Sequence, residues 1–153
     1  MAHPAQAEFI SKVREFHPQA FSGVRVLEVG AVDINGSVRE LFHNCDYTGA
    51  DLQLGAGVDL ACQGQLLELP SNSFDTAISA ECLEHNPYWR ETLGNMLRMT
   101  KPNGLVLITC ATVGRKEHGT TRTNPEASPF TAAANWDYYR NLTARDIEAA
   151  LNL

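Results

Sequence analysis

The chain lacks three features, and each absence argues against a class of function. The longest apolar run, about residues 105–113, is too short to cross a bilayer. Lys and Arg form no run or stripe and the net charge is −6, which disfavours nucleic-acid binding because phosphate contacts need clustered cations. The cysteines, Cys45, Cys62, Cys82 and Cys110, are all more than four residues apart. They spell no metal-binding knuckle, so we predict no metal site.

The composition is that of a single globular domain. Apolar residues make up 44% of the 153 residues and charged residues 20%, which is typical of a folded chain. Residues 1–16 lack the charged-then-apolar order of a secretory signal, and isolated cysteines usually behave as small buried apolar residues. We therefore expect a reduced, cytoplasmic setting. The same N-terminal stretch has helical spacing, with Phe9, Val13 and Phe16 on one stripe.

Apolar segments of strand length alternate along the chain with segments of helical spacing. We predict strands at residues 24–29, 46–51, 58–61, 74–81 and 105–110, and helices at residues 37–43, 86–100 and 144–151. This alternation predicts an α/β fold with a Rossmann-like, doubly wound, mostly parallel sheet and right-handed crossovers. In such sheets ligands bind beyond the carboxyl ends of the strands.

The C-terminal part of the chain differs from this core. From residue 111 to residue 139 the composition shifts to Thr, Gly, Asn, Pro and charge, and loops of this length inside a domain are usually functional lids or disordered. Thr143, followed three residues later by Asp146, fits a capping box that opens a last helix. We therefore expect a single domain over residues 1–153, with a core at 22–111, a long loop at 111–139 and a terminal helix at 143–151.

The most informative stretch is VRVLEVGAVDINGSVRELFHNCDYTGAD, residues 24–51. A strand reaches Glu28, a turn is built on Gly30, a helix opens near Gly36, and a second strand ends in Asp51, 21 residues after the first glycine. This layout places the anionic or zwitterionic part of a nucleoside cofactor at the turn and its ribose on the carboxylate. A dinucleotide site would need G-x-G-x-x-G, whereas this turn reads G-A-V-D-I-N-G. An NAD-dependent oxidoreductase is therefore the less favoured alternative.

Further motifs follow in order: LELPSNSFDTAIS at 67–79, SAECLEH at 79–85 and KPNG at 101–104. Together with EVGAVDINGSVR, this ordered set resembles the class I S-adenosylmethionine-dependent methyltransferases, methyltransferase type 11-like, over about residues 22–111. Weaker similarity extends to EHGT at 117–120 and YYRNLT at 138–143. The family core normally ends in two further strands, which this chain lacks; whether it is a fragment or a short form stays open.

The resemblance implies S-adenosylmethionine as the cofactor and assigns roles to the residues of the motifs. Gly30 would let the backbone approach the ligand, and Asn35 and Gly36, with Ser37, would present N–H groups to its carboxylate. Asp51 would accept from both ribose hydroxyls. The remaining cofactor-binding residues are Glu28 and Glu81 at the amino-acid half and Leu52, Gln65 and Leu66 at the adenine, where Gln65 would accept from the amino group.

Catalysis and partners are less constrained by the residues. His85 is the titratable side chain nearest the expected transfer centre, and histidine has the pKa class of a general base near neutral pH; packing at the helix start is the alternative. His118, Tyr138 and Tyr139 would contact a small-molecule acceptor or simply cover the sheet. The main alternative function is a non-catalytic cofactor-binding or partner-binding module, with a homodimer covering an exposed sheet edge. Neither nucleic acid nor membrane is expected as a partner.

Overall fold

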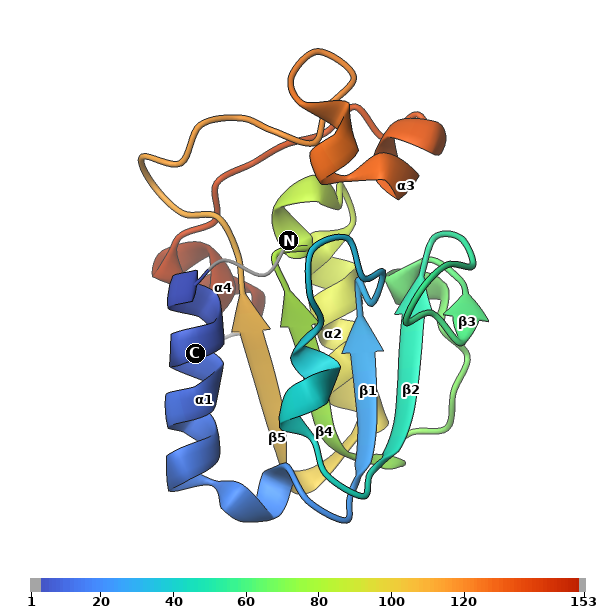
Figure 1. Ribbon diagram of the computed structural model, residues 1–153, viewed down its shortest axis with the longest axis vertical. Helices are drawn as coiled ribbons and strands as arrows, with labels where there is room; N and C mark the ends of the chain where they lie inside the picture. The colour runs from blue at the N-terminus through green and yellow to red at the C-terminus, as the bar shows by residue number, and fades with distance from the viewer. Residues whose placement is uncertain (1–3, 152–153) are drawn as a thin grey trace.

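The protein is described by a computed structural model over residues 4–151 (Figure 1). Five strands form one sheet in the order β3-β2-β1-β4-β5, and every neighbouring pair is parallel. The strands are β1 (Arg25–Val29), β2 (Asp46–Asp51), β3 (Leu60–Ala61), β4 (Phe74–Ala80) and β5 (Thr100–Thr109). The predicted Rossmann-like α/β fold is confirmed. Chain order reverses at β1, so the crevice beyond β1 lies at the topological switch point.

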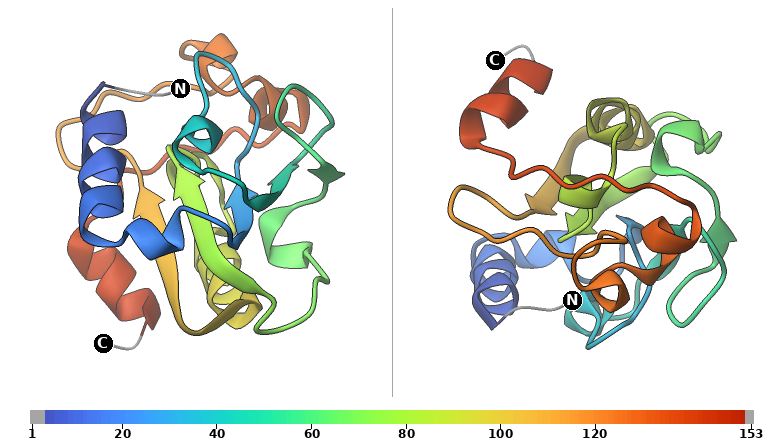
Figure 2. Two further views of the ribbon diagram at one scale, coloured as in Figure 1. Left: turned by 60° about the horizontal axis from the view of Figure 1, so that its bottom comes forward. Right: turned by 90° about the horizontal axis from the view of Figure 1, so that it is seen from above.

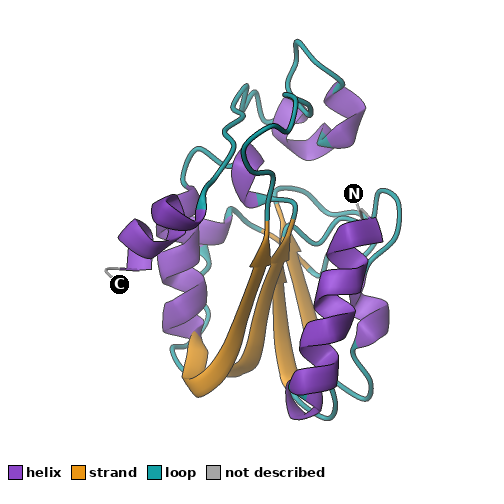
Figure 3. Ribbon diagram, turned by 90° about the vertical axis from the view of Figure 1, so that its left-hand side faces the viewer, coloured by secondary structure: helices purple, strands orange, loops and turns teal. Residues whose placement is uncertain are grey.

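Helices cover both faces of the sheet, which Figure 3 shows edge-on. The helices are α1 (Pro4–Phe16), α2 (Trp89–Met99), α3 (Pro129–Ala133) and α4 (Ala144–Leu151), with 3-10 turns η1 (Pro18–Ala20), η2 (Val38–Leu41), η3 (Gly64–Leu66), η4 (Leu83–His85) and η5 (Pro125–Ala127). Successive strand side chains point to opposite faces. Val26 therefore joins Ile10 of α1 in one apolar cluster, while Leu27 joins Met96 of α2 in the other.

Two predicted helices differ from the structure. The helix expected at residues 37–43 is only the single turn η2, and the helix expected from residue 86 begins at Trp89, after η4. The stripe expected on the N-terminal helix is wrong in part, because Phe16 is 80% exposed whereas Ile10 is fully buried. The face that meets the sheet carries the predicted Val13 together with Ile10, which takes the place predicted for Phe9.

Residues 111–139, here called the covering segment, lie across the carboxyl ends of the strands, as the view from above in Figure 2 shows. The segment contains the short helices η5 and α3. The predicted capping box follows it: Asp146 Oδ2 accepts from the Thr143 N–H at 2.9 Å, and Thr143 Oγ1 accepts from the Asp146 N–H at 3.2 Å. Among the helices of residues 4–151, none has the length and apolarity needed to cross a membrane.

Candidate functional site

The turn after β1 fits glycine alone. Gly30 has φ +87°, and its N–H donates to the Ala50 carbonyl at 2.9 Å. A Cβ at this position would lie 2.4 Å from Cβ of Cys82. Both the backbone conformation and the close approach therefore exclude a side chain. The neighbour that requires glycine is Cys82, which follows β4, rather than open space for a ligand.

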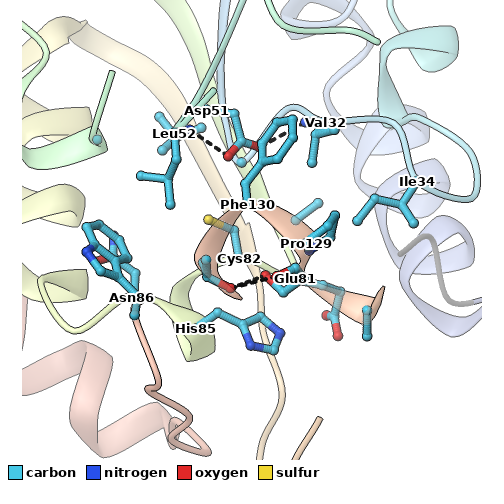
Figure 4. A pocket seen from close by; sticks show the side chains of 18 of the residues that line it. Val32, Ile34, Asp51, Leu52, Glu81, Cys82, His85, Asn86, Pro129 and Phe130 are labelled. Atoms are coloured by element: carbon cyan, nitrogen blue, oxygen red, sulfur yellow. Dashed lines mark hydrogen bonds between the residues drawn. The ribbon is translucent and has the colours of Figure 1, made fainter. Parts of the chain in front are cut away.

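Asp51 ends β2 and ties the glycine turn to it. Its Oδ2 accepts from the Val32 N–H at 3.0 Å and its Oδ1 from the Leu52 N–H at 2.7 Å, as Figure 4 shows. Burial raises the pKa of Asp51 above its ordinary value, and these two N–H groups act against that rise. A carboxylate accepts about four hydrogen bonds. Asp51 therefore keeps acceptor positions for a ligand.

A pocket lies beside Asp51, here called the Asp51 pocket. It is lined by Gly30, Val32, Ile34, Asp51, Leu52, Cys62, Gly64, Glu81, Cys82, His85, Pro129, Phe130 and Trp136, among others. Its volume is about 60 Å³, far below the roughly 300–1,000 Å³ of ligand pockets. The covering segment narrows this pocket, because Phe130 lies beside Asp51 (Figure 4). The Phe130 ring also packs closely on the loop after β2: a Cβ on Gly55 would be 2.9 Å from Cζ of Phe130.

Three predicted cofactor residues do not line this pocket. Glu28 lies elsewhere, 4% exposed, where the Tyr47 hydroxyl donates to its Oε2 at 2.8 Å. Burial raises the pKa of Glu28 to about 7. Glu28 and Gly36 border a smaller neighbouring cavity of about 20 Å³, which shares Gly30 and Val32 with the Asp51 pocket. Asn35 is exposed and lines neither cavity, because Gly36 donates its N–H to Asp33 Oδ1 and the turn closes on itself.

Gln65 and Leu66 also depart from the prediction. In η3 it is Gly64 that lines the Asp51 pocket, and its neighbours do not. The Gln65 amide donates to Gln63 Oε1 at 2.7 Å, and Leu66 is 59% exposed. A Cβ on Gly64 would lie 2.6 Å from the Thr92 methyl group. This close approach to α2 puts the backbone of η3, rather than the Gln65 side chain, at the pocket wall.

Glu81 and His85 both line the Asp51 pocket. Glu81 follows β4 with φ +52°, a left-handed conformation. His85 is 3% exposed, and burial, together with nearby His118, lowers its pKa to about 3. A base of that pKa is poorly matched to neutral pH. The general-base role of His85 stays a prediction, and the desolvation that acts against it is visible only in the fold.

A second cavity, here called the His85 cavity, opens on the other side of this histidine. It has a volume of about 470 Å³ and is lined by Glu81, His85, Gly114, Arg115, Lys116, Glu117, His118, Asn124 and Ala127. Most of these residues come from the covering segment. Glu81, His85 and Ala127 line both cavities, so the two spaces adjoin. The arrangement places a narrow pocket beside Asp51 and a larger space next to it.

Residues 1–141 match the family described as "Methyltransferase domain". The chain belongs to this methyltransferase family. Comparison with curated protein sequences found no match.

Three solved structures resemble this methyltransferase domain. Haemonchus contortus phosphoethanolamine N-methyltransferase 2, in complex with S-adenosyl-L-methionine, is 22% identical with a TM-score of 0.64; the match covers 95% of this chain and 35% of that protein. Burkholderia thailandensis 1,6-didemethyltoxoflavin-N1-methyltransferase, with S-adenosylhomocysteine bound, is 16% identical with a TM-score of 0.61, and the match covers 99% of this chain and 79% of that protein. The cyclase SpnF is 20% identical with a TM-score of 0.65, and the match covers 95% of this chain and 56% of that protein. At these identities the likeness establishes the fold. The chain spans about a third of the first protein's length.

Sequence reasoning missed two parts of the methyltransferase domain's site. Phe130 closes the Asp51 pocket from a segment more than seventy residues beyond Asp51 in the chain, and no local pattern announces it. Glu84 is fully buried, and burial raises its pKa to about 7. Its position beside His85 in the motif AECLEH was the available signal, because residues that follow the carboxyl end of a parallel strand lie near the ligand crevice.

Proposed function

We propose that this protein transfers a methyl group from S-adenosylmethionine to a small-molecule acceptor. The observation that carries the proposal is Asp51, held by two backbone N–H groups at the end of β2, next to the Gly30 turn at the switch point of the sheet. Its free acceptor positions suit the two hydroxyls of a ribose. Membership of the methyltransferase family and structural neighbours crystallised with this cofactor or its product support the same reading.

The cofactor would enter by displacing part of the covering segment. The adenosine would occupy the space between Asp51, Leu52 and Cys62 that Phe130 now narrows. Glu81, at the end of β4, would face the methionine half. The closed pocket argues for motion because an adenosyl group does not fit within about 60 Å³. Closure by such a segment also excludes water from the transfer.

The acceptor would occupy the His85 cavity. Methyl transfer needs the nucleophile, the methyl carbon and the leaving sulfur in line, and it needs little else from the protein. A space of about 470 Å³ next to the Asp51 pocket provides room for a small molecule. We place the reaction in the cytoplasm, with a small molecule rather than nucleic acid or membrane as the partner.

Calorimetric titration with S-adenosylhomocysteine and, separately, with NAD tests the cofactor. We expect S-adenosylhomocysteine to bind one site per chain and NAD not to bind. Tight NAD binding without S-adenosylhomocysteine binding would refute the proposal. Incubation with radiolabelled S-adenosylmethionine and a cell metabolite extract then identifies the acceptor as a new labelled compound.

A non-catalytic binding module is the second candidate, and the closed Asp51 pocket is the observation that favours it. Within residues 4–151, β5 forms one edge of the sheet and pairs only with β4. An open edge can pair with a second copy, so this reading proposes a homodimer through β5. Size-exclusion chromatography tests it: a stable monomer that binds S-adenosylhomocysteine contradicts the dimeric module.

A further inference from the structure

Two buried polar atoms without partners lie on neighbouring residues after β4. In the described part of the chain, only Glu84, His85 and Thr109 have a buried side-chain polar atom with no hydrogen-bond partner. Glu84 is fully buried and His85 is 3% exposed. The unpartnered atoms are Oε2 of Glu84 and Nδ1 of His85. Leaving such groups unpaired costs about 1–3 kcal/mol each, so two of them on neighbouring residues point to a ligand.

The backbone holds Glu84 firmly in this position. Its other carboxylate oxygen, Oε1, accepts from the Ala111 N–H at 3.0 Å, where the covering segment leaves β5. Its main-chain carbonyl accepts from the Arg140 N–H at 2.9 Å, where that segment returns. Glu84 is therefore fixed from both ends of the covering segment. One oxygen is used for structure and the other is left over.

His118 of the covering segment completes the group. Its ring lies 4.9 Å from the His85 ring, centroid to centroid, at 83°. The segment approaches this closely because Gly119 follows, with φ +65°, where a Cβ would be 2.7 Å from Cε1 of His85. Nδ1 of His118 is 3.0 Å from the Lys116 carbonyl. A carbonyl only accepts, so Nδ1 carries the proton in this contact, which leaves Nε2 as the nitrogen that would bind a metal.

We propose that Glu84, His85 and His118 bind a divalent transition-metal ion, with Zn²⁺ the best match. One ligand atom from each residue lies within 4.8 Å of the other two. Two imidazoles and one carboxylate form a donor set that zinc uses in catalytic sites, leaving a further position open. Ligand atoms around tetrahedral zinc lie roughly 3.4 Å apart, given bonds of about 2.0–2.2 Å, so the side chains draw together on binding.

Two further observations support this site. Metal-bound histidines commonly donate their second N–H to a backbone carbonyl, which is the arrangement of His118 and Lys116. Glu84 and His85 are both buried, so their unpartnered side-chain atoms are kept away from solvent. The cysteine spacing predicts no metal site, but this site uses no cysteine. Its ligands come from two segments that only the fold brings together.

The open position of the ion would face the His85 cavity, which His85 and His118 both line. This part rests on the proposed function and narrows the acceptor to a molecule with a hydroxyl group. The hydroxyl oxygen binds the ion and releases its proton to water in the cavity. An oxygen lone pair then forms the bond to the methyl carbon, and the electrons of the carbon–sulfur bond pass to sulfur, giving the methyl ether and S-adenosylhomocysteine.

Calorimetry on chelator-treated, dialysed full-length protein tests the site with ZnCl₂ alone. We expect one ion per chain, and at least a tenfold loss of affinity in His118→Gln. This variant changes a half-buried side chain on a loop, so its circular dichroism should match the wild type. Glu84→Gln should weaken binding as well. His17→Gln, an exposed histidine outside the group, is the matched control and should bind like the wild type.

A Co²⁺ titration separates this site from adventitious cysteine binding. We expect a d–d spectrum without thiolate charge-transfer bands. Wild-type protein that binds no ion, affinity that is unchanged in His118→Gln and in Glu84→Gln, or a thiolate spectrum would each overturn the site. The outcome is independent of the cofactor proposal. Zinc binding without S-adenosylhomocysteine binding removes only the role in methyl transfer, whereas the reverse result removes only the metal.

Discussion

The two adjoining cavities are built in different ways. The walls of the Asp51 pocket come mainly from strand ends and the turns that follow them, joined by hydrogen bonds between the Gly30 turn and β2, and a smaller part of the lining, including Phe130, comes from the covering segment. The His85 cavity is several times larger and lined mostly by the covering segment itself. Under the proposed function, the sheet would fix where the cofactor binds, whereas the covering segment would determine which acceptor is taken and when the site opens.

The largest expected effect in the region built from strand ends concerns Glu28. Its pKa rises from an ordinary 4.5 to about 7 in the folded state because burial disfavours the charge. This raised pKa stabilises the protein fully below pH 4.5, and the stabilisation is lost as pH rises through 7. The shift corresponds to about 3 kcal/mol. The Glu28→Gln side chain still accepts from the Tyr47 hydroxyl but does not titrate. The unfolding free energy of the variant, relative to that of the wild type, should therefore increase by up to that amount as pH rises from 4.5 to 8.

Urea unfolding at several pH values measures this effect. Glu40→Gln, an exposed acid on η2, is the matched control and should follow the wild-type pH profile. Equal pH dependence in wild type and Glu28→Gln would mean that Glu28 is charged and solvated at neutral pH. The strand-end region would then be less closed than its packing indicates.

Asp51→Asn tests the half of the site that the sheet provides. Loss of the charge should raise the Kd of S-adenosylhomocysteine about 10- to 100-fold, since hydrogen bonds to a charged group contribute about 1.5–3 kcal/mol. Calorimetry gives the Kd, and thermal unfolding verifies the fold. Asp75→Asn, at the opposite end of β4, should leave the affinity unchanged. Unaltered affinity in Asp51→Asn would remove the ribose from this carboxylate.

Phe130→Ala tests the covering segment, and its expected effect is smaller. Without the ring the pocket is open in a larger fraction of molecules, so S-adenosylhomocysteine should associate up to about tenfold faster. Stopped-flow fluorescence measures the rate. Phe16→Ala, an 80% exposed phenylalanine on α1, is the control. An unchanged rate in Phe130→Ala would show that the covering segment does not limit entry of the ligand. The two cavities would then differ less than proposed.

Three of the five strands could be predicted to within one residue, and the site only in part. Strand β2 has the predicted bounds, and β1 and β4, which are mostly buried as central parallel strands are, each differ by one residue. Strand β3 begins two residues later than predicted, and β5 begins at Thr100, five residues before its predicted start. Gly30, Asp51, Leu52, Glu81 and His85 line one pocket, as strand ends must. Gln65 and Leu66 do not, since the packing of η3 on α2 decides which way that turn faces.

The sequence by itself determined the order in which functional motifs follow the strands of this methyltransferase domain. A glycine turn follows the first strand, an acidic residue ends the second, and an acidic motif follows the fourth. These signals are local, because backbone conformation and apolar patterning act over a few residues. Only the tertiary structure decided that Phe130 narrows the pocket, that Glu28 borders a neighbouring cavity instead of lining the pocket, and that His118 meets Glu84 and His85. Those contacts, and the desolvation that shifts the pKa values of Glu28 and His85, depend on segments distant in the chain.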